Sequence, residues 1–278
     1  MKIILITGIS SGIGRALAES FLEQGHQVIG SVRDPQGLEN LKSKYGAKLI
    51  LWRCNLLNIS EIDSIQSLFS ENKINRIDVV VNNAGIVTSA PFEYQNFSEI
   101  QNTMGTNVLA VMKLTQLMIP YLMPTQGRII NISSISGTGG TPFLAAYCAS
   151  KYAIEGFSES LRREMKLHGI KVSVIGPGSI KTPIWKKGFE TVRSKYSATP
   201  YQESFNRFID FAKSEEENAL PTSAVVDNVM HAAFSNRPKI RYAPIPRKFL
   251  NVFLPQLLPK FIVDYMTCKA LRLRIKKN

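Results

Sequence analysis

The sequence predicts an α/β fold: a single domain built on a doubly wound, Rossmann-like parallel sheet with helices on both faces. Six short apolar runs alternate with longer segments of helical periodicity, and this pattern is typical of a parallel sheet that is covered on both faces. The first run is followed directly by a glycine-rich turn. With 278 residues, of which 44% are hydrophobic, the chain is long enough to bury the core of one such domain.

The expected strands are the six apolar runs, at residues 2–7, 27–32, 48–52, 78–82, 128–133 and 171–176. Helices are expected between them, as in residues 13–24 and 62–69, where apolar residues recur at steps of three or four. Right-handed crossovers between parallel strands place ligands at the carboxyl ends of the strands. The functional residues are therefore expected just after each run.

Positive charge is concentrated near the C-terminus. The net charge is +13, of which residues 237–278 carry +10, from eleven Lys or Arg and one acidic residue. The same region contains the apolar segment FLNVFLPQLLPKFIVDYM. The sequence therefore predicts a main domain at residues 1–240 and a basic, apolar C-terminal extension at residues 241–278.

The cysteine and histidine contents argue against a disulfide framework and predict no metal site. Cys54, Cys148 and Cys268 are an odd number without CxxC spacing, and the three histidines are scattered. Reduced thiols are typical of a cytoplasmic protein. The apolar run at the N-terminus is too short for the hydrophobic region of a secretory signal, which also favours the cytoplasm.

The turn TGISSGIG, residues 7–14, stands between the first expected strand and the first expected helix. Dinucleotide-binding folds have their phosphate loop here, because a glycine turn lets the backbone approach a pyrophosphate and the helix N-terminus attracts its charge. The glycine spacing is GxxxGxG instead of the commoner GxGxxG. Six residues of the turn are candidates for cofactor contact: Gly8, Ser10, Ser11, Gly12, Ile13 and Gly14.

Four further motifs follow in order: NNAG at 82–85, a serine thirteen residues before a tyrosine, YCASK at 147–151 and PGSIKT at 177–182. Together with TGISSGIG, they resemble the motifs of the short-chain dehydrogenase/reductase family. The stretch YCASKYAIEGFSESLRREM resembles the hydroxysteroid and retinol dehydrogenase branch of that family. The resemblance covers residues 7–182 and implies a nicotinamide-dependent oxidoreductase that interconverts an alcohol and a carbonyl.

Four residues match the family's catalytic positions. Tyr147 matches the general acid and base; a phenol has a pKa of about 10, and Lys151, one helical turn away, is expected to lower it. By resemblance, Lys151 also holds the nicotinamide ribose. Ser134, in preference to the neighbouring Ser133, has the spacing of the residue that binds the substrate oxygen. Asn107 matches the asparagine that kinks its helix and supports a proton relay.

The resemblance implies further cofactor contacts after the fourth and sixth runs. After the fourth, Asn83, Ala84 and Gly85 are expected to touch the cofactor, while Asn82 is equally consistent with a structural role. After the sixth run, four residues are expected beside the nicotinamide: Pro177, Gly178, Ile180 and Thr182.

The residues expected around the adenosine indicate which nicotinamide cofactor is used. NAD-binding members have an acid at the end of the second strand, where it binds the ribose 2′-hydroxyl, but this chain has Val32 followed by Arg33. A guanidinium suits a 2′-phosphate, so NADP(H) is predicted to be preferred, with NAD(H) as the alternative. Arg15 either adds positive potential or is a solvated helix residue. Asn55, followed by Leu56, stands where the family usually has an aspartate near the adenine.

The residues after Thr182 carry many aromatic side chains and no further motif. Members of the family use this segment, here about residues 183–221, as a flap over the substrate. Seven aromatic residues lie in it: Trp185, Phe189, Tyr196, Tyr201, Phe205, Phe208 and Phe211. They fit an apolar substrate such as a steroid, a retinoid or another lipid-like ketone or alcohol, or they simply cover the core.

The C-terminal extension leaves three interpretations open. An apolar segment beside a basic run can rest on an anionic membrane surface, fold over the substrate pocket or form a subunit interface. The extension contains YMTCK, in which Tyr265 and Lys269 have the same spacing as in YCASK. Because no other motif surrounds this pair, both are expected to be surface residues. The basic residues of the extension lie among apolar residues, and no nucleic-acid recognition motif is present. Binding of nucleic acid is therefore not expected.

The sequence thus predicts an NADPH-preferring oxidoreductase that acts on the carbonyl or hydroxyl group of a small apolar molecule in the cytoplasm, with peripheral membrane contact as an option. The alternatives are a generalist carbonyl or aldehyde reductase and a non-catalytic nicotinamide-sensing protein. By resemblance, subunits pair into a homodimer or homotetramer through the helices that contain Asn107 and Tyr147.

Overall fold

The computed structural model describes residues 1–182, 193–246 and 257–274. Within these residues, the centre of the molecule is a sheet of seven parallel strands in the order β3-β2-β1-β4-β5-β6-β7. The strands are β1 (Ile3–Ile6), β2 (Gln27–Val32), β3 (Leu49–Arg53), β4 (Val79–Asn82), β5 (Arg128–Ile132), β6 (Lys171–Ile175) and β7 (Arg241–Tyr242). Strand β1 pairs with β2 on one side and with β4 on the other. The strand order reverses there, and folds of this kind bind their ligands at that point.

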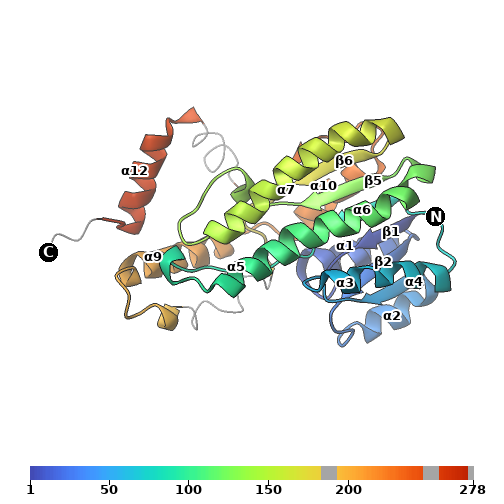
Figure 1. The fold of residues 1–278 in the computed structure, drawn as a ribbon, viewed down its shortest axis with the longest axis horizontal. Helices are drawn as coiled ribbons and strands as arrows, with labels where there is room; N and C mark the ends of the chain where they lie inside the picture. Colours follow the sequence, from blue (N-terminus) through green and yellow to red (C-terminus); the bar gives the residue numbers. More distant parts are fainter. Residues whose placement is uncertain (183–192, 247–256, 275–278) are drawn as a thin grey trace.

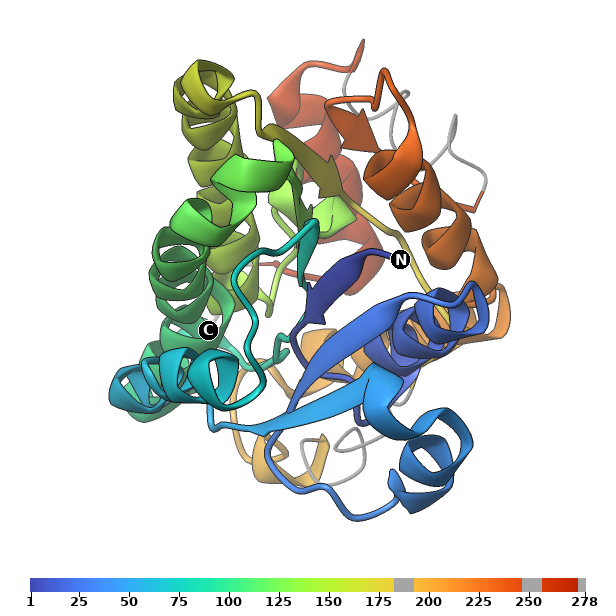
Figure 2. The ribbon, with the colours of Figure 1, turned by 90° about the vertical axis from the view of Figure 1, so that its right-hand side faces the viewer.

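Helices connect the strands and cover both faces of the sheet, as Figure 2 shows. In the described part of the chain, the α-helices are α1 (Gly12–Glu23), α2 (Glu39–Tyr45), α3 (Ile59–Ile62), α4 (Ser64–Glu71), α5 (Phe97–Met104), α6 (Ala110–Leu122), α7 (Ala145–Glu164), α9 (Gln202–Glu217), α10 (Ser223–Phe234) and α12 (Lys260–Leu271). Short 3₁₀ helices lie between them: η1 (Gly46–Lys48), η2 (Phe92–Tyr94), η4 (Met123–Thr125), η5 (Ile135–Gly137) and η6 (Met165–His168). A π-helical turn, η3 (Gly105–Leu109), joins α5 to α6.

The predicted fold class is confirmed. Each of the six predicted strands is present, with ends that differ from the prediction by at most one residue. The sequence gives no sign of the seventh strand, because two residues carry no periodicity. Arg241 and Tyr242 belong to the region that the sequence assigns to the C-terminal extension, yet they pair with Val174 and Ile175 of β6. The sheet therefore continues past residue 240.

Alternate residues of each strand build one hydrophobic core on each face of the sheet. On the first face, residues of β1, α1 and α10 pack together, among them Ile4, Ile6, Leu17, Phe21 and Val229. On the second face, residues of β1, α4 and α6 pack together, among them Leu5, Ile65, Phe69, Leu114 and Met118. Full burial of one such side chain contributes about 1.5–3 kcal/mol. Both cores fix the strands, and with them the residues at their carboxyl ends.

The helical segment Phe97–Thr125, which runs from α5 to η4, is long and apolar enough to cross a membrane by length and composition. Its apolar side is nevertheless used inside the protein. Ala110, Leu114, Met118 and Leu122 are buried in the core of the second face. We therefore interpret this segment as a core helix of the domain.

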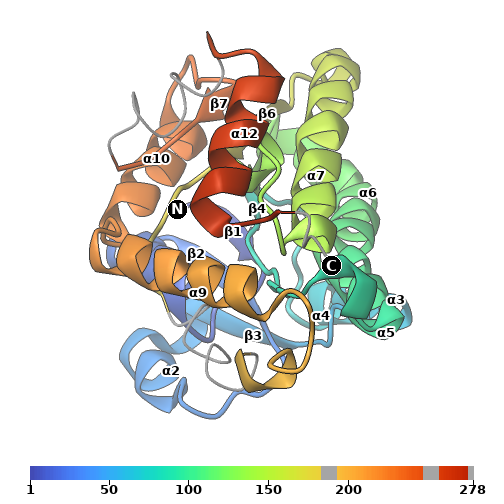
Figure 3. The ribbon, with the colours of Figure 1, turned by 90° about the vertical axis from the view of Figure 1, so that its left-hand side faces the viewer.

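The helices α9 and α12 lie at the end of the molecule toward which the strands run (Figures 1 and 3). The two helices contact each other at the end of α12. The Ser204 hydroxyl donates to the main-chain carbonyl of Arg272 at 3.2 Å, and Arg272 pairs with Glu203 at 2.5 Å. Leu271 is buried. The C-terminal extension is thus packed against a helix of the predicted flap.

Candidate active site

The glycine-rich turn after β1 forms a tight loop at the carboxyl edge of the sheet. Gly8 has a φ of +74°, a conformation that L side chains rarely adopt. A Cβ atom at Gly14 would lie 2.1 Å from the main-chain oxygen of Gly8. Asn83, from the loop after β4, donates its side-chain amide to the carbonyls of Thr7 at 2.9 Å and Gly8 at 3.2 Å. These contacts hold the turn in one shape and leave no room for a side chain at Gly14.

The amino end of α1 follows this turn and is suited to an anion. Ser11 caps the helix in an extended conformation without a side-chain hydrogen bond, and the first turn contains no acidic residue. Free backbone N–H groups at a helix start favour a phosphate. Ser10 and Ser11 are exposed here, and Gly12 and Ile13 are partly buried. The predicted loop residues therefore lie where a cofactor pyrophosphate would be bound.

The NNAG segment contains one buried structural residue and three residues at the carboxyl edge of the sheet. Asn82 is buried, and its amide donates to Asn131 of β5 at 2.8 Å and to Thr115 of α6 at 3.1 Å. Asn131 in turn donates to Ser158 of α7 at 2.8 Å. This polar chain ties β4, β5, α6 and α7 together inside the molecule. Asn83, Ala84 and Gly85 are only partly buried.

Ser134 lies two residues after the end of β5 and caps the start of η5. Its hydroxyl accepts a hydrogen bond from the backbone N–H of Ser136 at 3.1 Å, and it forms a side-chain hydrogen bond with Tyr147. The hydroxyl of the neighbouring Ser133 is buried and has no hydrogen-bond partner among the described residues. Among the described residues, the tyrosine is hydrogen-bonded to Ser134 and not to Ser133, which supports the sequence preference for Ser134.

Tyr147 and Lys151 face the same edge from the first turns of α7. Tyr147 is 8% exposed and Lys151 is 5% exposed. The lysine Nζ lies 5.7 Å from the centre of the tyrosine ring and donates to the main-chain carbonyl of Ile132 at 2.9 Å. An ammonium has three donors, so two remain for a bound ligand. A Cβ built at Gly85 would lie 3.7 Å from Nζ, which places the NNAG loop next to the ammonium.

Burial has the largest effect on the pKa values of Tyr147 and Lys151, and the lowering of the Tyr147 pKa by Lys151 stays a prediction. Burial raises the pKa of Tyr147 to about 12, and the hydrogen bond with Ser134 opposes this rise. Burial lowers the pKa of Lys151 to about 8, against the attraction of the Glu155 carboxylate. Desolvation dominates because both side chains are removed from water. Tyr147 is therefore protonated at neutral pH, while Lys151 is still largely charged.

Asn107 lies in the π-helical turn η3 and is 1% exposed. Its side-chain oxygen accepts from the N–H of Ile86 at 2.8 Å, and its amide donates to the carbonyl of Ile86 at 2.9 Å. The same amide donates to the hydroxyl of Ser150 at 3.0 Å. Asn107 thus joins the segment after β4 to the helix that carries Tyr147 and Lys151. The predicted irregularity of its helix is present as the π-helical turn.

The residues predicted to contact adenosine lie at the ends of β2 and β3. Val32 is buried, whereas the following Arg33 is exposed. Arg15 is engaged: its Nε pairs with Glu19 at 2.7 Å, and its Nη1 donates to the carbonyl of Gly37 at 3.1 Å. Within the described residues, Arg33 has no such partner and is available to an anionic ligand.

Asn55 and Leu56 follow β3 in a turn. Asn55 is exposed, and its side-chain oxygen accepts from the N–H of Leu57 at 3.3 Å. Its own N–H donates to the carboxylate of Glu61 at 2.8 Å. The asparagine thus has a local role in shaping the turn, and it lies at the same edge of the sheet as the glycine loop.

The loop after β6 is held by main-chain hydrogen bonds. The carbonyl of Pro177 accepts from Ile135 at 2.9 Å, and the N–H of Gly178 donates to Pro244 at 3.1 Å. Ile180 is buried and pairs with Leu220, and Thr182 is partly buried. The first bond brings this loop directly beside the serine loop that carries Ser134.

An apolar cluster surrounds the phenol of Tyr147. Besides Tyr147 it contains Ala90, Phe143, Leu144, Cys148, Tyr196, Phe205, Phe208, Ile209 and Leu271. Phe205 packs edge-on against Phe143 and Tyr196, each at 5.2 Å between ring centres. Tyr201 lies against the cluster, but Phe211 is 56% exposed. The predicted aromatic residues Trp185 and Phe189 lie outside the described residues.

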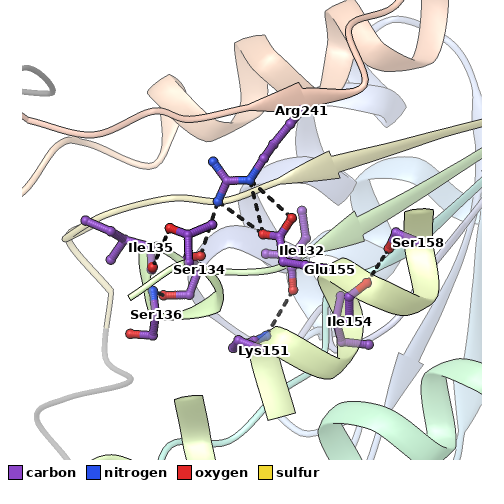
Figure 4. Close-up of polar contacts among 10 residues, drawn as sticks. Ile132, Ser134, Ile135, Ser136, Lys151, Ile154, Glu155, Ser158 and Arg241 are labelled. Atoms are coloured by element: carbon purple, nitrogen blue, oxygen red, sulfur yellow. Dashed lines mark hydrogen bonds and ion pairs between the residues drawn. The ribbon is translucent and has the colours of Figure 1, made fainter. Parts of the chain in front are cut away.

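The sequence did not single out several residues of this site. Phe143 and Leu144 stand in the loop before YCASK, and Leu271 stands in the C-terminal extension; nothing in a linear pattern links the two segments. Glu155 and Arg241, which lie beside Ser134 and Lys151 in Figure 4, were also not predicted. Glu155 could have been found, because it stands one helical turn after Lys151.

The two tyrosine–lysine pairs have the same internal geometry and different surroundings. In YMTCK the Lys269 Nζ lies 5.8 Å from the ring centre of Tyr265, close to the 5.7 Å in YCASK. Tyr265, however, is 65% exposed, whereas Tyr147 is 8% exposed. Burial, and not the spacing, distinguishes the candidate catalytic pair.

The arrangement can bind a dinucleotide along the carboxyl edge of the sheet and donate a proton at one end of it. Gly14 packs against the loop backbone, α1 offers free N–H groups, and Lys151 has two unused donors, so the residues present fit a nicotinamide dinucleotide. No group of three His, Cys, Asp or Glu side chains able to hold a metal occurs in the described residues.

Comparison with known proteins extends this description. A family model described as short chain dehydrogenase matches residues 2–193. The chain is 31% identical over 278 residues to an NADPH-dependent 3-dehydrocapnine reductase of Ornithobacterium rhinotracheale, covering 98% of both chains. It is 36% identical over 223 residues to a 3-ketodihydrosphingosine reductase of Bacteroides thetaiotaomicron, covering 78% of each. The fold resembles the crystal structure of a short-chain dehydrogenase from Streptomyces avermitilis, with a TM-score of 0.80, 24% identity and coverage of 99% of this chain and 98% of that one.

Proposed function

Because this chain belongs to the short-chain dehydrogenase/reductase family, we propose that it reduces the carbonyl group of an apolar, lipid-like molecule with NADPH. The bound cofactor supplies the hydride. The residues of the chain bind the substrate oxygen, donate the proton and exclude water from the site. The alternatives are a generalist carbonyl or aldehyde reductase and a nicotinamide-sensing protein without catalysis.

The observation that carries this proposal is the buried, protonated phenol of Tyr147 beside Ser134 and Lys151. The hydroxyls of Tyr147 and Ser134 both donate to a carbonyl oxygen placed between them. As this oxygen gains negative charge, Tyr147 transfers its proton to it. The remaining phenolate is stabilised by Ser134 and by the Lys151 ammonium. A pKa of about 12 for Tyr147 keeps the proton on the phenol until this step.

Asn107 is proposed to support the return of the proton to Tyr147. Its side chain fixes Ile86 and Ser150, and the Ser150 hydroxyl donates to the carbonyl of Tyr147 at 2.7 Å. A shift of Asn107 would therefore displace both the NNAG side of the site and the helix that carries the tyrosine. Its part is to keep the two segments in register.

The residues proposed to hold the cofactor come from five loop segments along the carboxyl edge and from α7. They are Gly8, Ser10, Ser11, Gly12, Ile13 and Gly14; Arg33; Asn55 and Leu56; Asn83, Ala84 and Gly85; and Pro177, Gly178, Ile180 and Thr182, together with Lys151. The preference for NADPH rests on the exposed Arg33 after the buried Val32, since a guanidinium binds a 2′-phosphate by charge-assisted hydrogen bonds. The relative from Ornithobacterium is named as NADPH-dependent, which supports the same preference.

The proposed substrate carries its carbonyl next to a long apolar portion. The cluster of Phe143, Phe205 and Phe208 adjoins the phenol, so an apolar chain attached to the carbonyl has a surface to pack against. Two relatives are named as reductases of 3-dehydrocapnine and of 3-ketodihydrosphingosine. We therefore place a long-chain 3-ketone first among the substrates to be tested, ahead of steroids and retinoids.

The test is an assay of apolar ketones, aldehydes and alcohols of increasing chain length with NADPH and NADH. Turnover should increase with the apolar chain and be lost in Tyr147→Phe. Equal rates on short, polar aldehydes would favour the generalist reductase. Binding of NADPH without turnover of any compound would favour the nicotinamide-sensing protein.

The same assay tests the cofactor preference. Arg33→Ser should lower the preference for NADPH over NADH by about 10- to 100-fold, because a charge-assisted hydrogen bond is worth about 1.5–3 kcal/mol. Arg76→Ser, which removes another arginine of a loop, is the matched control. If Arg33→Ser leaves the preference unchanged, the 2′-phosphate is bound elsewhere.

We further propose that the protein works in the cytoplasm and touches a membrane surface through α12. Cys54, Cys148 and Cys268 are all free, which suits a reducing compartment. On α12, Phe261, Tyr265 and Met266 are 57–72% exposed, with Lys260 and Lys269 on the same helix. The other end of α12 packs at Leu271 into the cluster around Tyr147. A lipid surface there would lie next to the proposed site of a lipid-like substrate.

A homodimer through α7 and η3 is the proposed assembly. Leu109 of η3 and Tyr152 of α7 are 53% and 47% exposed, and the two elements pack on each other. Sedimentation analysis of the wild type should give a dimer or a tetramer made of two such dimers. A double variant, Leu109→Asp with Tyr152→Asp, should sediment as a monomer; an unchanged assembly would place the interface elsewhere.

A further inference from the structure

Arg241 of β7 and Glu155 of α7 form an ion pair beside the candidate catalytic residues (Figure 4). The Nε of Arg241 donates to both carboxylate oxygens at 3.2 Å, and its Nη2 donates to Oε1 at 3.1 Å. The two side chains are only 28% and 19% exposed. A planar guanidinium that contacts a carboxylate through several hydrogen bonds fixes orientation better than a solvated pair does. The pair therefore fastens the end of β7 to α7.

The same guanidinium contacts the serine loop. Its Nη2 donates to the main-chain carbonyl of Ser134 at 3.4 Å, and Ser134 shares a hydrogen bond with Tyr147. Glu155 stands one helical turn after Lys151 on α7 and attracts its positive charge. One arginine thus contacts both segments that carry the candidate catalytic groups.

Two glycines make the space that the pair occupies. A Cβ at Gly176, in the loop after β6, would lie 2.2 Å from Nη2 of Arg241. A Cβ at Gly137, in η5, would lie 3.0 Å from Cγ of Glu155. No larger residue fits at Gly176 without displacing the guanidinium. The surrounding loops are therefore shaped around this pair.

The short strand β7 is anchored so that Arg241 is held in place. The hydroxyl of the adjacent Tyr242 accepts from the N–H of Lys239 at 2.9 Å and lies 2.7 Å from Nδ1 of His231 on α10. The carbonyl of Tyr242 accepts from Gly176 at 2.8 Å. A strand of two residues adds little to the sheet, but these contacts fix the backbone from which Arg241 extends.

We propose that Arg241 and Glu155 are positioning residues of the reductase: they set the distance between the Ser134 loop and the helix that carries Tyr147 and Lys151. Arg241 also balances the negative charge of Glu155 next to Lys151. This inference rests on the proposed function. Because Arg241 is used in this pair, it is not among the C-terminal cations that could contact a membrane.

The pair determines the charge around Lys151. The charged and titratable groups that face it in the described structure are Glu155 and Tyr147 on α7 and, behind Glu155, Arg241 on β7; η3 contributes the neutral Asn107. Without Arg241, the Glu155 charge acts on Lys151 alone and favours the ammonium. Without Glu155, the guanidinium is unbalanced and disfavours it. The two losses therefore act on Lys151 in opposite directions.

The test measures kcat, KM and the pH dependence of kcat/KM for the reduction of a ketone at saturating NADPH. Arg241→Met should lower kcat by about 10- to 100-fold, because small misplacements of catalytic groups have such effects, with little change in KM. The alkaline limb of its kcat/KM profile, where Lys151 loses its proton, should move to higher pH. The alkaline limb of Glu155→Gln should move to lower pH. Arg241→Lys, which keeps the charge and loses the planar fork, should leave the limb near its wild-type position while kcat stays low.

The matched control is Arg163→Met, which breaks an arginine–glutamate pair with Glu159 on the same helix, where the side chains are 65% and 56% exposed. It should change neither kcat nor the alkaline limb. If Arg241→Met and Glu155→Gln lower thermal stability but shift the limb in the same direction or not at all, the pair is only a structural fastening. If the wild type reduces no carbonyl, the proposed function is wrong. If the wild type is active and the Arg241 variants are equally active, only the positioning role of the pair is wrong.

Discussion

At the scale of single residues, burial separates two side-chain pairs that share one spacing. Tyr147 and Tyr265 each have a lysine four residues later, at nearly the same distance from the ring. Only Tyr147 is surrounded by apolar side chains and hydrogen-bonded to a serine. A proton donor needs a fixed position next to the reacting atom and little competing water. The difference between the pairs is therefore one of environment.

Tyr147→Phe should reduce kcat by about 10²- to 10⁴-fold, the usual contribution of a positioned proton donor, while NADPH still binds. The matched control is Tyr265→Phe, which removes the hydroxyl from the exposed pair and should leave kcat unchanged. Steady-state kinetics with NADPH and the best ketone of the panel measure both. Comparable activity of the two variants would show that Tyr147 is not the proton donor.

The buried ammonium of Lys151 lowers the free energy of unfolding of the chain. Its pKa is about 8 in the folded chain, below the ordinary value of 10.5, so the folded state disfavours the ammonium. The resulting loss of folding free energy is fully present below pH 8. It disappears as the pH rises from 8 to 10.5, because Lys151 is already neutral in the folded chain and becomes neutral in the unfolded chain as well.

Lys151→Met should therefore raise the free energy of unfolding at pH 7, by about 2 kcal/mol after allowing for the hydrogen bond lost at Ile132. The gain should shrink between pH 8 and 10.5. Urea unfolding of both proteins across this pH range measures the effect, together with NADPH binding, which the variant should weaken. A gain that is the same at every pH would mean that the buried charge is not its cause.

At the scale of elements, the phosphate loop depends on the close approach of two backbone segments. The start of α1 lies so near Gly8 that a Cβ at Gly14 has no space. Gly156, in the middle of α7, has no atom within 4 Å of an added Cβ. The two positions make a matched pair for the same substitution.

Gly14→Ala should destabilise the chain by about 1–3 kcal/mol through overpacking and should weaken NADPH binding strongly. Gly156→Ala should stabilise it by about 0.5–1 kcal/mol, since alanine is the better helix former, with NADPH binding unchanged. Thermal unfolding and fluorescence titration of NADPH measure the two effects. If Gly14→Ala binds NADPH as the wild type does, the loop is not the pyrophosphate site.

At the scale of the whole molecule, α12 links a basic, apolar surface to the interior of the site. The helix exposes Phe261 and Tyr265 and buries Leu271 in the cluster around Tyr147. The sequence leaves open membrane contact, folding over the substrate pocket and a subunit interface for the extension, and the burial of Leu271 in this cluster favours the second for the end of α12. Contact with a membrane remains a proposal for its exposed face.

Phe261→Ser combined with Tyr265→Ser should weaken binding to vesicles of anionic lipid by about 10-fold or more, given about 1.5–3 kcal/mol for each large apolar side chain that is buried. Binding of the wild type should also fall as salt is added. Leu167→Ser is the control: Leu167 is 85% exposed but lies in η6, at the other end of α7. Equal binding by the wild type and the double variant in vesicle sedimentation would exclude α12 as the contact.

The strands, the glycine loop and the catalytic candidates can be predicted from the sequence alone, because they depend on local periodicity and on motifs within a few residues. Asn107, Ser134, Tyr147 and Lys151 could be named from the sequence, and the structure places them at one edge of the sheet. The surroundings of these four residues become visible only in the folded chain. Leu271 is buried in the same apolar cluster as Tyr147, whose pKa is raised by burial, and Arg241 contacts Ser134; each of these links joins segments more than a hundred residues apart. Such contacts follow from the packing of the whole sheet, and no local pattern encodes them.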